Sequence, residues 1–283
     1  MPAKTGNGLK KALLTGGTSG IGLSIARELI LQDYQVVLIG RNRQKGQAIA
    51  FELNTQRPES TQFVELDLSN LNSVLQFSDQ FMTVHERLDV LANIAGAMYP
   101  KRQETQEGLE KNFAVNYLSA FLLSTQLVPL LERTQGARIV NVAAAPSQML
   151  KESIDFDDLQ FAKKYSGFKA ATAAVHAKTV LSEILSEQYT SKGIDVNSFD
   201  PGFVRSHLMD NMPLMVRGTI TLLWPLFAKT STNGVYACSC KEIQGVTGML
   251  FHKKKAIPLH FEKPYKERLW KQTEDLVAKV LQR

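Results

Sequence analysis

The sequence predicts an α/β fold in which one doubly wound parallel sheet is flanked by helices on both faces. Short apolar segments alternate with amphipathic ones along the chain, which is typical of parallel strands joined by crossover helices. A glycine-rich turn at residues 15–22 joins the first apolar segment to the first amphipathic one. With 283 residues, 44% of them hydrophobic, the chain can bury a large core. No linker, repeat or low-complexity tract divides it, so we expect one domain spanning residues 1–283.

The individual elements follow from the hydrophobic pattern. The expected strands are near-continuous apolar runs, as in a sheet covered on both faces; they are residues 11–15, 35–40, 62–66, 88–93, 138–142 and 195–199. The expected helices carry apolar residues at helical spacing; they are residues 22–31, 44–54, 71–85, 108–132 and 170–189. Ligands of such sheets bind at the carboxyl ends of the strands, near the point where the strand order reverses. We therefore expect the functional site at that edge.

The glycine-rich turn, TGGTSGIG at residues 15–22, is suited to binding phosphate. Glycines permit tight turns and close approach of the backbone, and the following helix offers unpaired N–H groups and a positive dipole end. Its spacing, Gly-x-x-x-Gly-x-Gly, differs from the Gly-x-Gly-x-x-Gly dinucleotide fingerprint. The alternative is a glycine-rich turn that binds no ligand. The other motifs have to distinguish between these two interpretations.

The end of the second strand indicates which dinucleotide would bind. An acidic residue there would accept hydrogen bonds from a ribose and favour NAD. Here the strand is followed by Arg41, Asn42 and Arg43, with Lys45 nearby and no acid. Because a guanidinium pairs with phosphate in two parallel hydrogen bonds, the sequence favours NADP(H), whose ribose carries a 2′-phosphate.

Composition excludes several other classes. The net charge of +6 comes partly from the C-terminal region, and we interpret it as a solvated surface because no nucleic-acid-binding motif accompanies it. The N-terminus lacks the apolar core of a signal peptide, and no apolar run is long enough to span a bilayer. The two cysteines, Cys238 and Cys240, match no metal-binding pattern and are typical of a reducing compartment. We therefore expect no metal and a cytoplasmic location.

Together the motifs resemble the short-chain dehydrogenase/reductase family, specifically its retinol-dehydrogenase-like branch, over nearly the whole chain. Residues 15–22 are similar to its Thr-Gly-x-x-x-Gly-Ile-Gly turn, residues 67–68 to its adenine-side Asp-Leu, and residues 93–96 to its Asn-Asn-Ala-Gly, with Ile94 as a departure. The resemblance implies a Rossmann-type fold and an NADP(H) site. The implied cofactor-binding residues are Gly16, Thr18, Ser19, Gly20, Ile21, Gly22, Arg41, Asn42, Lys45, Asp67, Leu68, Asn93, Ala95, Gly96, Pro201, Gly202 and Val204.

The catalytic half of the family pattern departs in this chain. The family uses a serine after the fifth strand, and a tyrosine with a lysine four residues later that lowers the pKa of the phenol. Ala144 occupies the expected serine position, with Ser147 three residues further on. The catalytic tyrosine normally stands about thirty residues before the Pro-Gly turn, and this spacing puts Ala171 at the tyrosine position and Val175 at the lysine position.

One apparent match to the catalytic pair remains. Tyr165 and Lys169 have Tyr-x-x-x-Lys spacing, but Tyr165 stands 36 residues before Pro201. A six-residue displacement along a helix is about 9 Å with roughly 240° of rotation. We therefore interpret Tyr165 and Lys169 as less suitable substitutes, and the usual Ser-Tyr-Lys set as lost. Asn116 matches the asparagine of the family's proton relay; the alternative is a helix asparagine that satisfies backbone groups.

The resemblance also places a substrate lid at residues 208–228, where methionine, leucine and tryptophan side chains would form an adaptable apolar roof. We expect an atypical NADP(H)-dependent oxidoreductase acting on a hydrophobic small molecule. The alternatives are a non-catalytic NADP(H)-binding regulatory protein and a non-redox enzyme that uses the same pocket. Peripheral membrane contact is compatible with the lid, and a homodimer would pair through residues 108–132 and 170–189.

Overall fold

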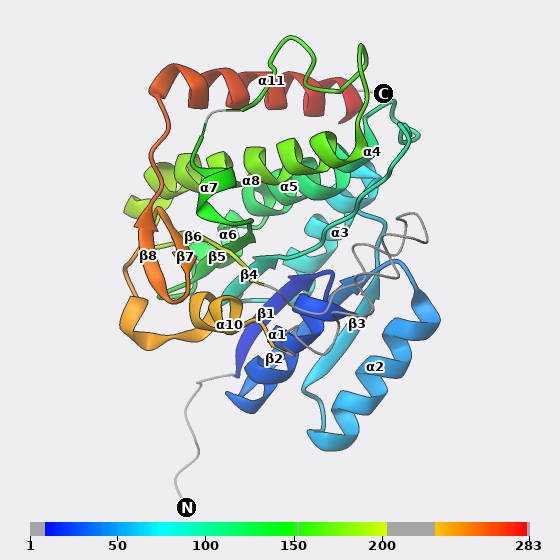
Figure 1. Ribbon diagram of the computed structural model, residues 1–283. Coiled ribbons are helices and arrows are strands. Elements are labelled where there is room, and N and C mark those ends of the chain that lie inside the picture. Colours follow the sequence, from blue (N-terminus) through cyan, green and yellow to red (C-terminus); the bar gives the residue numbers. More distant parts are fainter. Residues whose placement is uncertain (1–8, 152, 203–229, 282–283) are drawn as a thin grey trace, which may run out of the picture.

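The computed structural model describes residues 9–151, 153–202 and 230–281, and it confirms the α/β fold (Figure 1). One eight-stranded sheet has the order β3-β2-β1-β4-β5-β6-β7-β8. All neighbouring pairs are parallel except β7 and β8, which are antiparallel. The strands are β1 (Lys10–Thr15), β2 (Tyr34–Gly40), β3 (Thr61–Glu65), β4 (Val90–Asn93), β5 (Arg138–Val142), β6 (Asp195–Phe199), β7 (Met249–His252) and β8 (Lys255–Pro258).

The strand order reverses between β1 and β4. From β1 the chain continues to β2 and β3 on one side of the sheet, and from β4 to β5 and β6 on the other. The loops after β1 and β4 therefore diverge at the carboxyl edge, where a doubly wound sheet binds its ligand. The glycine-rich turn follows β1 directly.

Helices cover both faces of the sheet (Figure 1). They are α1 (Gly20–Leu31), α2 (Arg43–Gln56), α3 (Leu71–Val84), α4 (Lys111–Phe113), α5 (Ser119–Gln126), α6 (Val128–Glu132), α7 (Pro146–Met149), α8 (Gly167–Tyr189), α10 (Thr232–Ser239) and α11 (Lys263–Leu281). Two apolar clusters result. The larger joins the sheet to α3, α5 and α8, and the smaller joins it to α1 and α10 on the opposite face.

The helix expected over residues 108–132 is wrong in its continuity. Helix α4 begins at Lys111 and continues through a π-helical segment (Ala114–Leu118) into α5. The helical structure is then interrupted at Leu127, before α6 begins. Pro129, at the start of α6, lacks the N–H that a continuous helix would need. The helix expected from residue 170 begins three residues earlier, at Gly167.

The C-terminal part contains elements that the hydrophobic pattern did not predict, namely α10, β7, β8 and α11. Helix α11 packs against α3 and α8, and it lies along the outer side of the helical layer (Figure 1). The Trp270 ring meets Phe121 at a centroid distance of 5.1 Å, and the Tyr117 hydroxyl shares a 2.8 Å hydrogen bond with Thr273. The chain therefore covers part of its own α5 and α8 surface.

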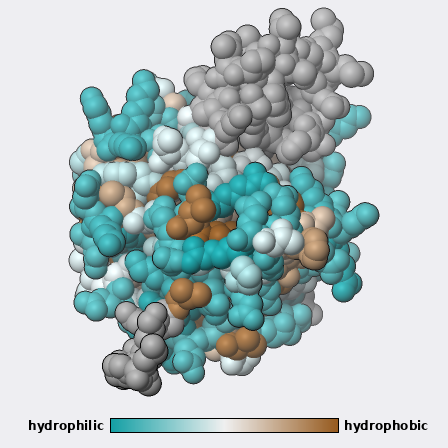
Figure 2. All heavy atoms as spheres, turned by 90° about the horizontal axis from the view of Figure 1, so that it is seen from below, coloured by the Kyte–Doolittle hydropathy of each residue, from teal (hydrophilic) through white to brown (hydrophobic). Residues whose placement is uncertain are grey.

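Figure 2 shows the face seen from below in the orientation of Figure 1. Hydrophilic residues dominate the described part of this face, and apolar side chains form separate small groups among them. Among the described helices, none is long and apolar enough to cross a membrane.

Candidate functional site

The turn after β1 and the turn after β4 are held together by Thr15. Its Oγ1 accepts hydrogen bonds from the Ile94 and Ala95 amides at 2.9 and 3.0 Å. Gly16, at φ +67°, lies so close to the second turn that a Cβ on it would approach the Ala95 Cα to 2.9 Å. A side chain at residue 16 would therefore separate the two turns at the point where the strand order reverses.

The start of α1 has the features of a phosphate site. A Cβ on Gly22 would lie 2.3 Å from the Gly16 carbonyl oxygen, so only glycine allows the helix to start this close to the turn. Gly20 has φ +47°, and Ser19 precedes the helix without a capping hydrogen bond from its side chain. The first N–H groups of α1 are thus without a side-chain cap, and they point toward the turn that Gly16, Thr18, Ser19, Gly20, Ile21 and Gly22 form. This arrangement fits a pyrophosphate.

The residues after β2 have distinct arrangements. Arg41 is exposed, and its Nη1 donates a 3.0 Å hydrogen bond to the Tyr99 hydroxyl. Asn42 is the N-cap of α2, and its Oδ1 accepts from the Lys45 amide at 2.9 Å. The Lys45 side chain is exposed. The guanidinium and the ammonium are thus available for an anion, while the Asn42 carbonyl oxygen already caps the helix.

At the end of β3, Asp67 is exposed and Leu68 is buried. The Asp67 Oδ1 accepts hydrogen bonds from the Ser69 amide at 2.9 Å and the Ser69 hydroxyl at 2.8 Å. The carboxylate therefore fixes the turn after β3 next to the end of β2. The resemblance predicts an adenine contact for this turn.

The side chain of Asn93 lies in the core instead of lining the edge of the sheet. Its amide donates to the Ser124 hydroxyl at 3.0 Å and to the Asn141 Oδ1 at 2.8 Å, and Asn141 in turn donates to Ser182 at 2.8 Å. Asn93 is 1% exposed, and its Oδ1 has no hydrogen-bond partner among the described residues. Asn93 therefore fixes β4 to β5 and α5, and through its chain position it holds the turn that carries Ala95 and Gly96.

Lys178 is a residue that the sequence reasoning missed. Its side chain is fully buried on α8, and its Nζ lies 3.4 Å from the main-chain oxygen of Asn93. Burial lowers the pKa of Lys178 to about 7. The signal in the sequence is a single charged residue among alanines, valines and leucines, three residues after Val175 and hence on the same helix face. Helical side chains lean toward the N-terminus, so Lys178 extends back toward the turn that contains Val175.

Asn116 lies in the π-helical segment and contacts the loop after β4. Its Oδ1 accepts from the Ala97 amide at 2.7 Å, and its Nδ2 donates to the Ala97 carbonyl at 2.9 Å. Asn116 thus satisfies both backbone groups of one residue, the contact expected of a positioning asparagine. Such π-helical segments are frequent at functional sites.

The expected serine, tyrosine and lysine positions lie at the carboxyl end of β5 and along α8. Ala144 follows β5, and Ala171 and Val175 occupy the first half of α8. All three are partly buried. Ser147 is exposed within α7, after the loop. The three positions therefore carry only methyl and isopropyl groups at the edge where the β4 and β5 strands end.

Tyr165 and Lys169 do not share a helix face. Helix α8 begins at Gly167, so Tyr165 precedes it, and Lys169 is exposed. The Tyr165 hydroxyl donates to the Tyr99 carbonyl at 2.7 Å and lies 3.2 Å from Glu110 Oε1, while Asn112 donates to it at 2.7 Å. Burial and the neighbouring Glu110 raise the pKa of Tyr165, which opposes formation of a phenolate.

The Pro201-Gly202 turn follows β6 and is anchored by Asp200. The Asp200 Oδ1 accepts from the Gly202 amide at 2.9 Å, and its Oδ2 lies 2.7 Å from Nδ1 of His252 on β7. Gly202 has φ +69°. Val204 and the expected lid at 208–228 lie outside the described residues.

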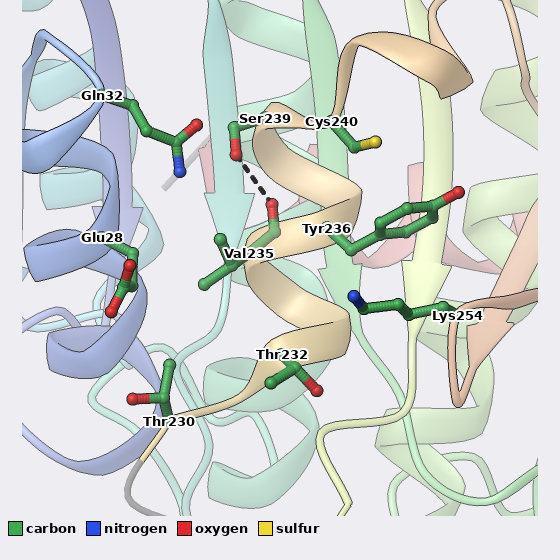
Figure 3. Close-up of a pocket in the computed structure, with 9 residues that line it drawn as sticks. All are labelled: Glu28, Gln32, Thr230, Thr232, Val235, Tyr236, Ser239, Cys240 and Lys254. Atoms are coloured by element: carbon green, nitrogen blue, oxygen red, sulfur yellow. Dashed lines mark hydrogen bonds between the residues drawn. The ribbon is translucent and has the colours of Figure 1, made fainter.

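A surface hollow of about 470 Å³ lies between α1 and α10 (Figure 3). Glu28 of α1 and Gln32, which directly follows that helix, line one side, and Val235, Tyr236 and Lys254 are among the residues on the other side. The glycine-rich turn is at the opposite end of α1. This hollow is therefore separate from the candidate cofactor site. No group of three or more metal-ligating side chains occurs in the part of the chain that the structure describes.

A protein-family model matches the larger part of the chain. The model described as short chain dehydrogenase matches residues 10–215. Among curated proteins, polyprenol dehydrogenase from Danio rerio is 34% identical over 286 residues, covering 95% of this chain and 87% of its own. Retinol dehydrogenase 12 from Homo sapiens is 31% identical, covering 92% of this chain and 84% of its own.

Solved structures agree with this match at the level of the fold. A protein of uncharacterized function from Mycobacterium paratuberculosis has a TM-score of 0.72 at 24% identity, covering 95% of this chain and 93% of its own. The NADP complex of RhlG from Pseudomonas aeruginosa has a TM-score of 0.57 at 26% identity, covering 72% of this chain and 76% of its own.

Proposed function

The chain belongs to the short-chain dehydrogenase family, in its retinol-dehydrogenase-like branch, and we propose that it is an atypical NADP(H)-dependent oxidoreductase acting on a hydrophobic small molecule. One observation carries the proposal. The glycine turn, with its uncapped α1 terminus, lies against the β4 turn at the reversal of strand order, while the positions expected for acid–base catalysis carry Ala144, Ala171 and Val175. We propose that a single domain holds this site.

The proposed cofactor contacts extend along the carboxyl edge of the sheet. Residues 16–22 would hold the pyrophosphate by their backbone N–H groups. Arg41 and Lys45 would pair with the 2′-phosphate, and the Asp67-Leu68 turn would border the adenine. Ala95 and Gly96 would line the middle of the dinucleotide, and Pro201 and Gly202 would border the nicotinamide. The buried Asn93 and the helix-capping Asn42 would support these contacts from behind.

The bound nicotinamide would supply hydride transfer. The chain's own contribution is then orientation and exclusion of water, which are large parts of such catalysis. Without a serine, tyrosine or lysine at residues 144, 171 and 175, we propose substrates that need little help from an acid, such as an iminium or an activated alkene. Asn116 would hold the loop at Ala97, and not relay protons.

The hydrophobic substrate class rests on two supports. The relatives are named for polyprenol and retinol, both long apolar alcohols. Residues 208–228, where we propose the lid, are rich in methionine, leucine and tryptophan. We propose peripheral membrane contact through this segment, and a cytoplasmic location without nucleic-acid partners. A homodimer through residues 108–132 and 170–189 would have to form beside α11, which covers part of that surface.

An equilibrium titration tests the cofactor site. We expect purified protein to bind NADPH at least tenfold more tightly than NADH, followed by cofactor fluorescence. Arg41→Asp should remove this preference, because it replaces the phosphate-pairing cation with a repelling carboxylate. Arg27→Asp on the exposed side of α1 is the matched control and should keep the preference. Failure of the natural chain to bind either cofactor would contradict the proposal.

A non-catalytic NADP(H)-binding regulatory protein is the second candidate. It is favoured by the same methyl-lined positions, Ala144, Ala171 and Val175, because they supply no proton donor. NADPH-selective binding without oxidation by any lipophilic aldehyde, imine or enone would support this candidate over the oxidoreductase. If the protein binds NADPH selectively and converts a substrate while the cofactor stays unoxidised, the result would instead support a non-redox enzyme.

A further inference from the structure

A hydrogen bond joins the segments that follow β2 and β4 at the carboxyl edge of the sheet. Arg41 comes directly after β2, and Tyr99 lies six residues after β4 ends. Strand β1 lies between these two strands. The Arg41 Nη1 donates to the Tyr99 Oη at 3.0 Å. Arg41, which we propose binds the 2′-phosphate, is therefore held by Tyr99 from the other side of the glycine-rich turn.

The backbone of Tyr99 is fixed at both of its polar groups. Its amide donates to the Asn112 Oδ1 at 2.9 Å, and its carbonyl accepts from the Tyr165 hydroxyl at 2.7 Å. The first residue of α8, Gly167, adds a steric limit, because a Cβ there would lie 2.3 Å from the Tyr99 carbonyl oxygen. Segments from α4, from the loop before α8 and from α8 itself therefore converge on this residue.

The Tyr99 side chain is also restrained. Tyr99 is 8% exposed, and the Lys111 ammonium lies 4.9 Å from the centre of its ring. Tyr99 Oη therefore has a defined position, whereas Arg41 is exposed and has many rotamers of its own. A hydrogen bond from the flexible partner to the fixed one removes part of that freedom before any ligand binds.

The bond leaves the guanidinium able to bind phosphate. An arginine has five N–H donors, and one bond to a phenol oxygen neither neutralises the charge nor occupies the rest of the fork. Among the described residues, Tyr99 is the hydrogen-bond partner that the structure shows for Arg41. The remaining donors are available to two phosphate oxygens.

We propose that Tyr99 is a positioning residue that sets the preference for a 2′-phosphorylated dinucleotide by orienting Arg41. Tyr165 and Asn112 act one step behind it, by fixing the Tyr99 backbone. Tyr165, the tyrosine of the Tyr-x-x-x-Lys match, then has a role in cofactor selectivity. This inference rests on the proposed NADP(H) site.

The test is the ratio of the NADH to the NADPH dissociation constant, because only the 2′-phosphate distinguishes the two ligands. Tyr99→Phe keeps the ring and removes the hydroxyl, and we expect the ratio to fall about 3- to 10-fold, the loss expected for one unrestrained arginine side chain. NADH binding should stay within twofold of the natural chain. Arg41→Met should abolish the preference, and adding Tyr99→Phe to it should change nothing further.

Tyr117→Phe is the matched control, since it removes another buried tyrosine hydroxyl, bonded to Thr273 at 2.8 Å. Its ratio should equal that of the natural chain. Tyr165→Phe is a second test variant, because it removes the hydroxyl that holds the Tyr99 carbonyl, and it should lower the ratio less than Tyr99→Phe does. It also tests the idea if Tyr99→Phe does not fold.

The outcomes separate the two proposals. A natural chain that binds neither cofactor, or both equally, overturns the NADP(H) assignment and this inference with it. A natural chain that prefers NADPH while Tyr99→Phe keeps the same ratio, or raises it, overturns the role of Tyr99 alone. An effect of Tyr99→Phe that persists in the Arg41→Met background also overturns it.

Discussion

The ammonium of Lys178 lies 3.4 Å from the main-chain oxygen of Asn93, with the side chain fully buried. The Asn93 side chain belongs to a buried network of neutral groups, in which Asn93, Asn141, Ser124, Ser182 and Ser198 are linked to one another by hydrogen bonds. Burial alone lowers the pKa of Lys178 to about 7. A charged form thus has no carboxylate to pair with in this network.

We predict that Lys178→Met raises stability at neutral pH by an amount that shrinks as the pH rises. In the unfolded chain the amine keeps its ordinary pKa near 10.5. Between about pH 7 and 10.5 the unfolded state therefore binds more protons, so the contribution of Lys178 to stability rises with pH. The difference in unfolding free energy between Lys178→Met and the natural chain should therefore decrease by up to about 1.4 kcal/mol per pH unit. Urea unfolding at pH 7, 8 and 9 measures it.

Lys169→Met is the control for this prediction, because Lys169 is an exposed lysine on the same helix. Its unfolding free energy should follow that of the natural chain at every pH. Parallel curves for Lys178→Met and the natural chain would mean that Lys178 stays charged when buried.

Restoring the family's catalytic side chains should create carbonyl reductase activity. We predict that the variant with Ala144→Ser, Ala171→Tyr and Val175→Lys reduces a retinal-like aldehyde with NADPH at least about 100-fold faster than the natural chain, since a positioned acid contributes on that order. The matched control has Ala171→Phe in place of Ala171→Tyr and should stay inactive. Equal rates in the tyrosine and phenylalanine versions would show that residue 171 is not the tyrosine position.

Tyr165→Phe should lower stability and leave turnover nearly intact. The variant loses a hydroxyl that bonds with Tyr99, Asn112 and Glu110, and leaving these groups without a partner should lower the free energy of unfolding by about 1–3 kcal/mol. Denaturant unfolding and the rate of cofactor oxidation measure the two effects. A rate that falls a thousandfold at unchanged stability would instead identify Tyr165 as the proton donor.

Gly22→Ala should weaken the binding of both dinucleotides. The added methyl group would lie 2.3 Å from the Gly16 carbonyl oxygen, so the turn and the start of α1 must separate. We expect weaker binding of NADPH and NADH alike, and an overpacking loss of about 1–3 kcal/mol in unfolding free energy. Arg27→Ala, which removes only a surface ion pair of the same helix with Glu52, should show neither effect. Unimpaired NADPH binding by Gly22→Ala would place the pyrophosphate elsewhere.

Most of the sheet could be predicted from the sequence because each strand is a local apolar run. The expected strands at residues 138–142 and 195–199 coincide with β5 and β6, and β1, β2 and β3 begin one residue earlier than expected. The interruption of the long helix at Leu127 could have been inferred from Pro129. The strands β7 and β8 could not, because four residues each are too few to show a clear periodicity. The buried residues of α11 do recur at helical spacing, but only the tertiary structure shows that this helix covers α3, α8 and Phe121.

The sequence by itself determined the family and the fold, and it predicts the loss of the catalytic side chains by placing Ala144, Ala171 and Val175 in the expected register. These follow from residue identity and spacing along one chain. Only the tertiary structure decided that Tyr165 precedes its helix and bonds to Tyr99, that Asn93 is buried, and that Lys178 reaches Asn93. These findings depend on contacts between residues 31 or more positions apart, such as Asn93 with Ser124 and Lys178 with Asn93, and such contacts are fixed by packing and not by local pattern.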